Sequence, residues 1–229
     1  MTKNPKRANG YSLVELLVAT VLFTIVAGTV FSLLLSAQLR YKGESDVTAS
    51  FQQANVAIDQ ITRDVHSTGY PPANAFVAGT SAQLMAVPFS WSLGYPSTQC
   101  VLYGSCGSVP GDNDLILEVG ADGGGGVQWI RYSLDGTTLK RAAVAKTQFG
   151  DPVDSTSGAA LVPYLENIVN GNKPIFSYYD SSGVPATRPA DIWQVKILLM
   201  VQSAEPDPQT HGYHTTMLTG QAIRINPNN

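Results

Sequence analysis

A single carboxylate lies at the start of the most apolar segment of this chain of 229 residues. After Glu15, residues 16–39 contain no ionisable side chain and are mostly Leu, Val, Ile, Phe and Ala. A carboxylate placed inside a membrane helix costs about 2.5–3.5 kcal/mol, so a charged partner is expected for it. The simpler alternative is that Glu15 lies among lipid headgroups and stays hydrated.

The other residues that could do chemistry form weaker patterns. His211 and His214 could share a metal ion, but no third ligand follows at a spacing typical of metal sites. Asp112, Asp114 and Asp122 offer oxygen ligands for Ca²⁺, although the Pro-Gly-Asp-Asn-Asp stretch also reads as a plain turn. The sequence shows no recognisable pairing of a nucleophile with a base. We therefore expect a protein that is not an enzyme and that uses no cofactor.

The two cysteines, Cys100 and Cys106, lie close together in a stretch rich in Gly, Ser, Pro and Tyr. In an exported domain this arrangement favours a small disulfide loop, and a pair of free thiols is the alternative. The net charge of −3 and the lack of a basic run in the body argue against nucleic-acid binding.

The residues before the apolar run are basic. Residues 1–10 contain Lys3, Lys6 and Arg7 and no acidic side chain, whereas the cations after the run are soon offset by Glu44 and Asp46. This asymmetry predicts a cytoplasmic N-terminus, with the rest of the chain across the membrane. The run exceeds the roughly 7–15 apolar residues of a secretory signal peptide. We therefore expect the apolar helix to remain on the mature protein.

An amphipathic helix is predicted to continue from the apolar run. Its apolar positions recur at spacings of three and four, which is typical of a helix packed on a core. These positions are Phe51, Ala54, Ile58, Ile61 and Val65, and the polar face includes Asp59, Gln60, Arg63 and Asp64. The prolines at 71 and 72 end the pattern, and none occurs between Pro5 and Pro71. One helix over 11–68, about 87 Å long, is predicted.

Beyond Pro72 the sequence alternates short apolar runs with turn residues. Strands are predicted at 83–87, 114–119, 127–133, 138–144, 175–179, 192–202 and 216–225. The Asp135-Gly136 pair favours a hairpin between two of them. The segments 90–111, 148–163 and 203–212 are interpreted as loops within one head.

The stretch Gly10-Tyr11-Ser12-Leu13-Val14-Glu15 resembles the processing motif of type IV pilin-like prepilins. The resemblance implies that a prepilin peptidase cuts after Gly10 and N-methylates Tyr11, a position where most members carry Phe. Glu15 then becomes the fifth mature residue. In the family its carboxylate is thought to pair with the new terminal amine of a neighbouring subunit, which is the partner that a buried carboxylate requires.

Later segments resemble a narrower group within this family. The similarity is to PilW-type minor pilins and to J-type pseudopilins of type II secretion, and it covers residues 57–70, 166–168, 176–180, Gly183, 195–199 and 222–226. The implied fold is α+β, a long helix packed on an antiparallel β-sheet head. Its parts are a cleaved cytoplasmic leader (1–10), a transmembrane and filament-core helix (11–40), the amphipathic half of the helix (41–70) and a β-rich globular head (71–229).

The resemblance implies a structural role in a filament. The expected function is that of a minor pilin that helps to initiate or prime assembly of a type IV pilus. The alternatives are a minor pseudopilin of type II secretion and an adhesin or DNA-uptake pilin. The implied partners are the prepilin peptidase and methyltransferase, other pilins or pseudopilins, the inner-membrane assembly platform and membrane lipid. The subunit would lie in the bacterial inner membrane as a single-pass protein, and later in a pilus, in the periplasm or at the cell surface.

Overall fold

The structure is a computed structural model that describes residues 12–69, 88–90, 111–120, 127–146, 151–207 and 210–225. The strand predicted at 83–87 and most of the loop predicted at 90–111 lie outside these ranges. So do the leader and the first residue after it.

One helix dominates the molecule. Helix α1 (Leu13–Ser67) has 55 residues and is therefore about 82 Å long. Gly28 and Gly43 both lie within it and do not interrupt it. The helix ends at Thr68, which is extended, and Gly69 follows with a φ of +75°, a conformation that glycine adopts without steric cost. The prediction of a single helix is confirmed, and its end is set by Gly69 before the prolines are reached.

The strands form two antiparallel sheets. The first has the order β1-β2-β3-β4 and consists of β1 (Asp114–Gly120), β2 (Val127–Asp135), β3 (Thr138–Ala145) and β4 (Val162–Leu165). The second has the order β5-β6-β7 and consists of β5 (Phe176–Tyr179), β6 (Gln194–Gln202) and β7 (Thr215–Ile223). In the described ranges, three short helical turns connect strands, namely α2 (Pro152–Ser155), η3 (Gly158–Ala160) and η4 (Pro189–Asp191).

The predicted hairpin joins β2 to β3. Asp135 faces Thr138 across the turn, and Gly136 has a φ of +62°. The strands predicted within the described ranges are confirmed with small shifts at their ends. Strand β4 was not predicted, because its four residues include Pro163 and follow a stretch that reads as a loop.

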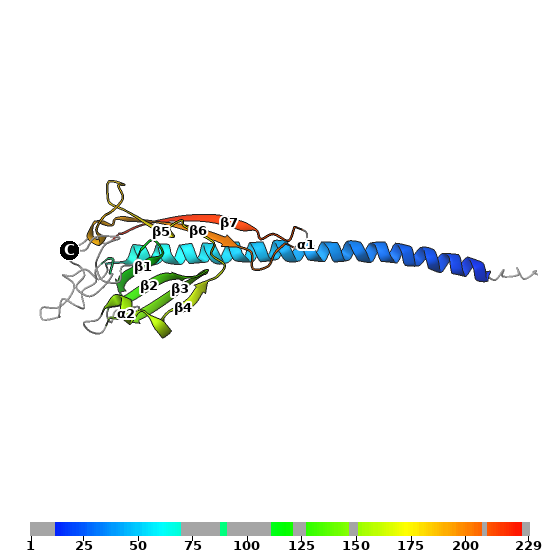
Figure 1. Ribbon diagram of the computed structural model, residues 1–229, viewed down its shortest axis with the longest axis horizontal. Coiled ribbons are helices and arrows are strands. Elements are labelled where there is room, and N and C mark those ends of the chain that lie inside the picture. Colours follow the sequence, from blue (N-terminus) through cyan, green and yellow to red (C-terminus); the bar gives the residue numbers. More distant parts are fainter. Residues whose placement is uncertain are drawn as a thin grey trace, which may run out of the picture.

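Figure 1 shows the C-terminal part of α1 lying between the two sheets, while its N-terminal part extends away from the head. The helix packs against β6 and β7 on one side and against β1 and β4 on the other. The α+β class is confirmed, but the described part of the head contains two sheets where one was expected. Each sheet turns an apolar face toward α1, so the helix completes the core of both.

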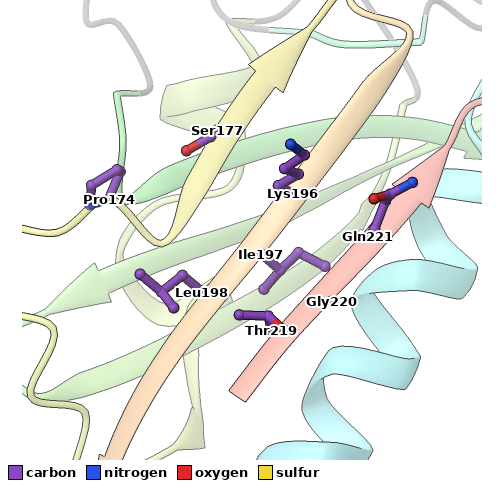
Figure 2. Close-up of a pocket in the computed structure, with 8 residues that line it drawn as sticks. All are labelled: Pro174, Ser177, Lys196, Ile197, Leu198, Thr219, Gly220 and Gln221. Atoms are coloured by element: carbon purple, nitrogen blue, oxygen red, sulfur yellow. The ribbon is translucent and has the colours of Figure 1, made fainter. Parts of the chain in front are cut away.

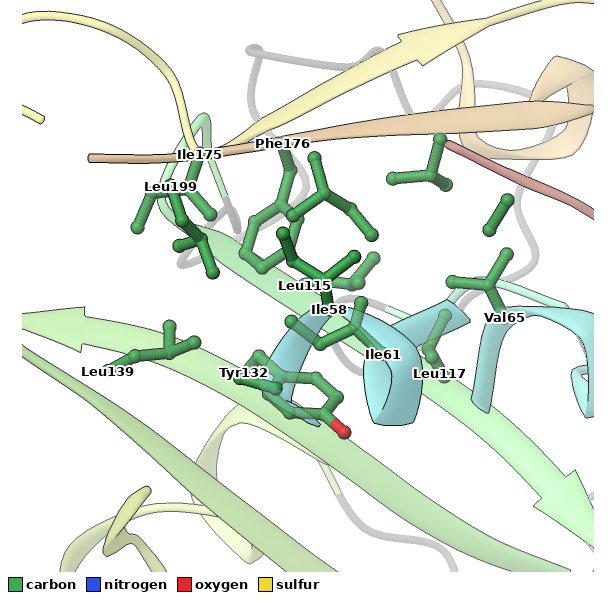
Figure 3. Close-up of a cluster of buried hydrophobic side chains, with 14 of the residues drawn as sticks. Ile58, Ile61, Val65, Leu115, Leu117, Tyr132, Leu139, Ile175, Phe176 and Leu199 are labelled. Carbon is green, nitrogen blue, oxygen red and sulfur yellow. The ribbon is translucent and has the colours of Figure 1, made fainter. Parts of the chain in front are cut away.

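The core lies where the three layers meet, as Figure 3 shows. Helix α1 contributes Ile58, Ile61 and Val65 to this core, and the first sheet contributes Leu115, Leu117, Tyr132 and Leu139. The second sheet contributes Phe176 from β5 and Leu199 from β6, together with Ile175 just before β5. Burial alternates along β6, as expected for a strand with one face on the core.

Two positions on α1 differ from the predicted helix faces. Phe51, predicted to be apolar core, is 43% exposed, because burial of the helix begins only at Ala54. Asp64, predicted to lie on the polar face, is only 6% exposed. It lies three residues after Ile61 and one before Val65, and therefore falls within the stripe that the sheets cover.

Helix α1 approaches β7 closely at a glycine. A Cβ atom added to Gly220 would lie 2.4 Å from Cγ2 of Ile58, well inside van der Waals contact. The lack of a side chain at Gly220 therefore allows α1 to lie directly on β7.

Candidate functional site

The N-terminal half of α1 is uncovered. Every residue from Leu13 to Leu39 is exposed, and no described residue of the head covers this part of the helix. Its most apolar window of 18 residues has a mean hydropathy of 2.4, and none of that window is buried. The segment is long and apolar enough to cross a membrane and is a candidate membrane anchor.

Four hydroxyl groups along this half of the helix are already bonded within it. Thr20, Thr24, Thr29 and Ser36 each donate to the carbonyl oxygen three or four residues earlier, at 2.7 to 3.0 Å. These side chains can therefore enter an apolar environment without a water partner. Among the described residues, Glu15 forms no hydrogen bond or ion pair.

Glu15 lies in the first turn of α1. Ser12 precedes the helix in an extended conformation, and its carbonyl oxygen accepts from the backbone N–H of Leu16 at 3.1 Å. A carboxylate near a helix N-terminus is favoured by the helix dipole by about 0.3–1 kcal/mol. Gly10 and Tyr11, the predicted processing residues, lie outside the described residues, so these two assignments stay predictions.

The comparison with protein families identifies this segment. Residues 5–31 match the model of the prokaryotic N-terminal methylation motif. The chain therefore carries a prepilin-type N-terminus. The match spans Gly10, Tyr11, Glu15 and much of the apolar run, and it supports the type IV pilin-like prepilin family, which is structural rather than catalytic. The motif does not separate PilW-type from J-type members. Neither the search of curated proteins nor that of solved structures gave a match.

Near the C-terminal end of α1, a buried polar cluster joins the helix to the first sheet. This Asp64 cluster consists of Asp64, Tyr132 and Arg141. The Tyr132 hydroxyl donates to Oδ2 of Asp64 at 2.5 Å, and Nη2 of Arg141 donates to the same oxygen at 3.1 Å. Nε of Arg141 also donates to the Tyr132 oxygen at 3.0 Å, which closes the triangle. Burial, and then the neighbouring Asp64 carboxylate, raise the pKa of the Tyr132 phenol. The phenol is therefore held protonated as a donor.

A second cluster lies on the other face of the first sheet. The buried Glu118 carboxylate accepts from Lys146 Nζ at 2.8 Å, from Trp129 Nε1 at 2.7 Å and from Ser90 Oγ at 2.8 Å. A cation and two neutral donors therefore surround this carboxylate. These bonds give Glu118 a structural role, because they help to hold residue 90 on β1.

Two of the acidic residues considered as calcium ligands, Asp112 and Asp114, form hydrogen bonds with other residues. Asp114 accepts from Nη2 and Nε of Arg131, at 2.5 and 2.9 Å. The backbone oxygen of Asp112 accepts from the Phe176 N–H at 2.8 Å, and Asp122 lies outside the described residues. In the part of the chain that the structure describes, no three His, Cys, Asp or Glu side chains group closely enough to hold a metal ion.

The two histidines considered as metal ligands belong to the connection between β6 and β7. Nε2 of His214 lies 3.1 Å from Oδ2 of Asp207, and the backbone N–H of His211 donates to the Asp207 carbonyl oxygen. Asp207 therefore organises this loop through both its side chain and its backbone. Cys100 and Cys106, the predicted disulfide, lie outside the described residues.

A shallow hollow of about 400 Å³ lies on the outer face of the second sheet (Figure 2). It is lined by Pro174, Ser177, Lys196, Ile197, Leu198, Thr219, Gly220 and Gln221. Among these residues only Lys196 is ionisable, and its Nζ lies over the Tyr179 ring, 4.3 Å from the ring centroid. The hollow therefore has no acid–base pair on its walls.

Proposed function

We propose that the chain is a minor pilin, a structural subunit that helps to initiate or prime assembly of a type IV pilus. The observation that carries the proposal is the prepilin motif at residues 5–31 on a helix whose apolar half is fully exposed and has Glu15 as its only ionisable residue. A helix that is apolar all round requires lipid or other helices around it. A membrane and a filament core each supply such surroundings.

The proposed sequence of events gives Glu15 its partner. The basic leader holds residues 1–10 in the cytoplasm while the helix spans the inner membrane. A prepilin peptidase then cuts after Gly10 and N-methylates the amine of Tyr11. When the helix leaves lipid for the filament, this cationic amine pairs with the Glu15 carboxylate of a neighbouring subunit, so that neither charge stays unpaired in an apolar core.

The head fits this role because it is fixed to the helix. The Asp64 cluster and the close contact at Gly220 hold α1 between the two sheets, so the head follows the position of the helix. We propose that the assembly platform and other pilins contact the subunit through α1. The large head, which spans 71–229 in the proposed division of the chain, supports a minor rather than a major pilin.

The similarity of residues 57–70 and 176–180 to J-type pseudopilins favours a second candidate, a minor pseudopilin of type II secretion. Deletion of the gene distinguishes the two functions. A minor pilin is required for surface pili, whereas a minor pseudopilin is required for release of secreted enzymes. A mutant that keeps normal pili but loses attachment or DNA uptake would instead support the adhesin or uptake pilin.

The processing step is tested by mass spectrometry of the protein from its bacterial membrane. We expect a chain that starts at an N-methylated Tyr11, and the same chain with its leader in a strain without prepilin peptidase. An intact leader in the strain that has the peptidase would refute the proposal.

The pairing step is tested with Glu15→Ala. Leaving a buried charge without its partner costs about 3–5 kcal/mol, and each 1.4 kcal/mol is a factor of ten. Recruitment into filaments should therefore fall at least about a hundredfold, while the amount of protein in the membrane stays the same. Thr20→Ala is the matched control, because the Thr20 hydroxyl is bonded within the helix. Normal recruitment of Glu15→Ala would contradict the pairing.

A further inference from the structure

The connection between β6 and β7 is held against α1 near the end of the apolar run. This β6–β7 loop consists of residues 203–207 and 210–214 in the described part of the chain. Nζ of Lys42 on α1 donates to Oε2 of Glu205 in the loop at 2.7 Å. Figure 1 shows the connection lying farther along α1 toward the N-terminus than the strands themselves.

The contact between Gly220 and Ile58 independently places the β6–β7 loop at the same level along α1. Gly220 on β7 lies against Ile58 on α1. From residue 58 back to residue 42 the helix extends about 24 Å, at 1.5 Å per residue. From residue 220 back to residue 214 the strand extends about 20 Å, at roughly 3.3 Å per residue. The two lengths agree, so β7 runs beside α1 and brings the β6–β7 loop to the level of Lys42.

This level lies just outside the apolar run. Lys42 is three residues beyond Leu39, the last residue of the run, which is about 4.5 Å along the helix axis. A bilayer has about 30 Å of hydrocarbon within a total of about 40–45 Å, so each headgroup layer is about 5–8 Å thick. When the apolar run lies in the hydrocarbon, the loop is therefore at the level of the headgroups.

The side chains at this level suit a headgroup layer. Tyr41 on α1 is 76% exposed and Tyr213 in the loop is 54% exposed. Tyrosine is enriched at membrane interfaces, where its ring meets the apolar side and its hydroxyl stays hydrated. Arg40 is exposed beside Tyr41, and a guanidinium can bind lipid phosphate through two hydrogen bonds.

We propose that the β6–β7 loop rests on the phospholipid headgroups of the outer face of the membrane while the subunit waits for assembly. The head is then supported at two points, by α1 and by this loop. The exposed pair formed by Lys42 and Glu205 marks where the loop meets the helix. The proposal rests on the membrane role of α1 and adds the surface of the head that faces the bilayer.

The test uses the full chain in vesicles of phosphatidylethanolamine and phosphatidylglycerol, with one photoreactive residue for each variant. Tyr213→p-benzoylphenylalanine and His211→p-benzoylphenylalanine probe the loop. Val184→p-benzoylphenylalanine is the matched control, because Val184 is 56% exposed but lies near the opposite end of β6. Leu35→p-benzoylphenylalanine, within the apolar run, reports on the membrane anchor itself. After irradiation, lipid adducts are measured by mass spectrometry.

We expect lipid adducts at Leu35 and at one or both loop positions, with a yield at Val184 at least about fivefold lower than at the loop. Adducts at Leu35 without any at the loop would overturn this inference and leave the membrane anchor intact. Equal yields at the loop and at Val184 would also overturn it. Absence of adducts at Leu35 would overturn both the membrane anchor and the loop contact.

Discussion

The close contact between Gly220 and Ile58 makes a quantitative prediction for Gly220→Ala. The new Cβ atom would lie 2.4 Å from Cγ2 of Ile58, whereas carbon atoms pack best at about 3.5–4.0 Å. Helix and strand must therefore separate by about 1 Å or more, or Ile58 must leave its rotamer. Ile58 is buried, and the Asp64 cluster holds α1 from the other side, so the strain has little room to relax.

The expected magnitude follows from two opposing effects. Overpacking of a core costs about 1–3 kcal/mol. Replacing a strand glycine by alanine returns about 0.5–1 kcal/mol, because the unfolded chain loses freedom. The difference spans about 0–2.5 kcal/mol, and the depth of this overlap places the expected loss in the upper part of that range, at about 1–2.5 kcal/mol. Such a loss lowers the melting temperature of a domain of this size by roughly 2–10 °C.

Urea unfolding of the full chain in detergent, followed by tryptophan fluorescence, measures the loss. Gly111→Ala is the matched control, because no atom lies within 4 Å of its added Cβ, and it should change stability by less than about 0.5 kcal/mol. Ile58→Ala removes the methyl group that clashes, so Gly220→Ala should cost almost nothing in that background. Equal costs of Gly220→Ala in both backgrounds, or no cost in either, would refute the clash.

Two further predictions concern the buried cluster. Asp64→Ala should lower the free energy of unfolding by about 3 kcal/mol, because Tyr132 and Arg141 lose their shared acceptor. The control is Asp59→Ala, at an exposed position on the same helix, which should change the free energy of unfolding little. Similar losses in the two variants would contradict a special role for Asp64. Because the pKa of Tyr132 is raised by burial, its contribution is complete below about pH 10, the ordinary tyrosine pKa, and is lost above it by up to about 1.4 kcal/mol for each pH unit. Unfolding curves measured from pH 9 to 11 should show this loss in the wild-type protein and a smaller one in Tyr132→Phe, and equal slopes would count against the raised pKa.

The long helix and most strands could be predicted from sequence because their signals are local. The absence of proline between Pro5 and Pro71 and the period of Ala54, Ile58, Ile61 and Val65 determine α1 within a few residues. The division of the strands into two sheets could not be predicted in this way. The division depends on which strand edges pair, and these edges are far apart in the chain. Strand β4 has only four residues, too few to stand out as a strand in the sequence.

The candidate site also contains residues that the sequence marks and residues that it does not mark. Glu15 and the apolar run stand out because a charge beside such a run is costly. Asp64 was assigned to the wrong face because its partner Arg141 lies 77 residues away, so that nothing local marks it as part of an ion pair. Glu205 was not singled out for the same reason, since its partner Lys42 lies 163 residues earlier in the chain.

The placement of α1 between two sheets also has a mechanical consequence. Strands β6 and β7 run beside the helix in Figure 1, and their ladder pairs nine residues of each strand. A pull on the N-terminal end of α1 therefore loads the side-chain packing between the helix and these two strands along its length. Contacts loaded in shear share the force and must break together, whereas contacts opened from one end break in succession. A head attached in this way can bear tension that would unzip one attached by a single crossing strand.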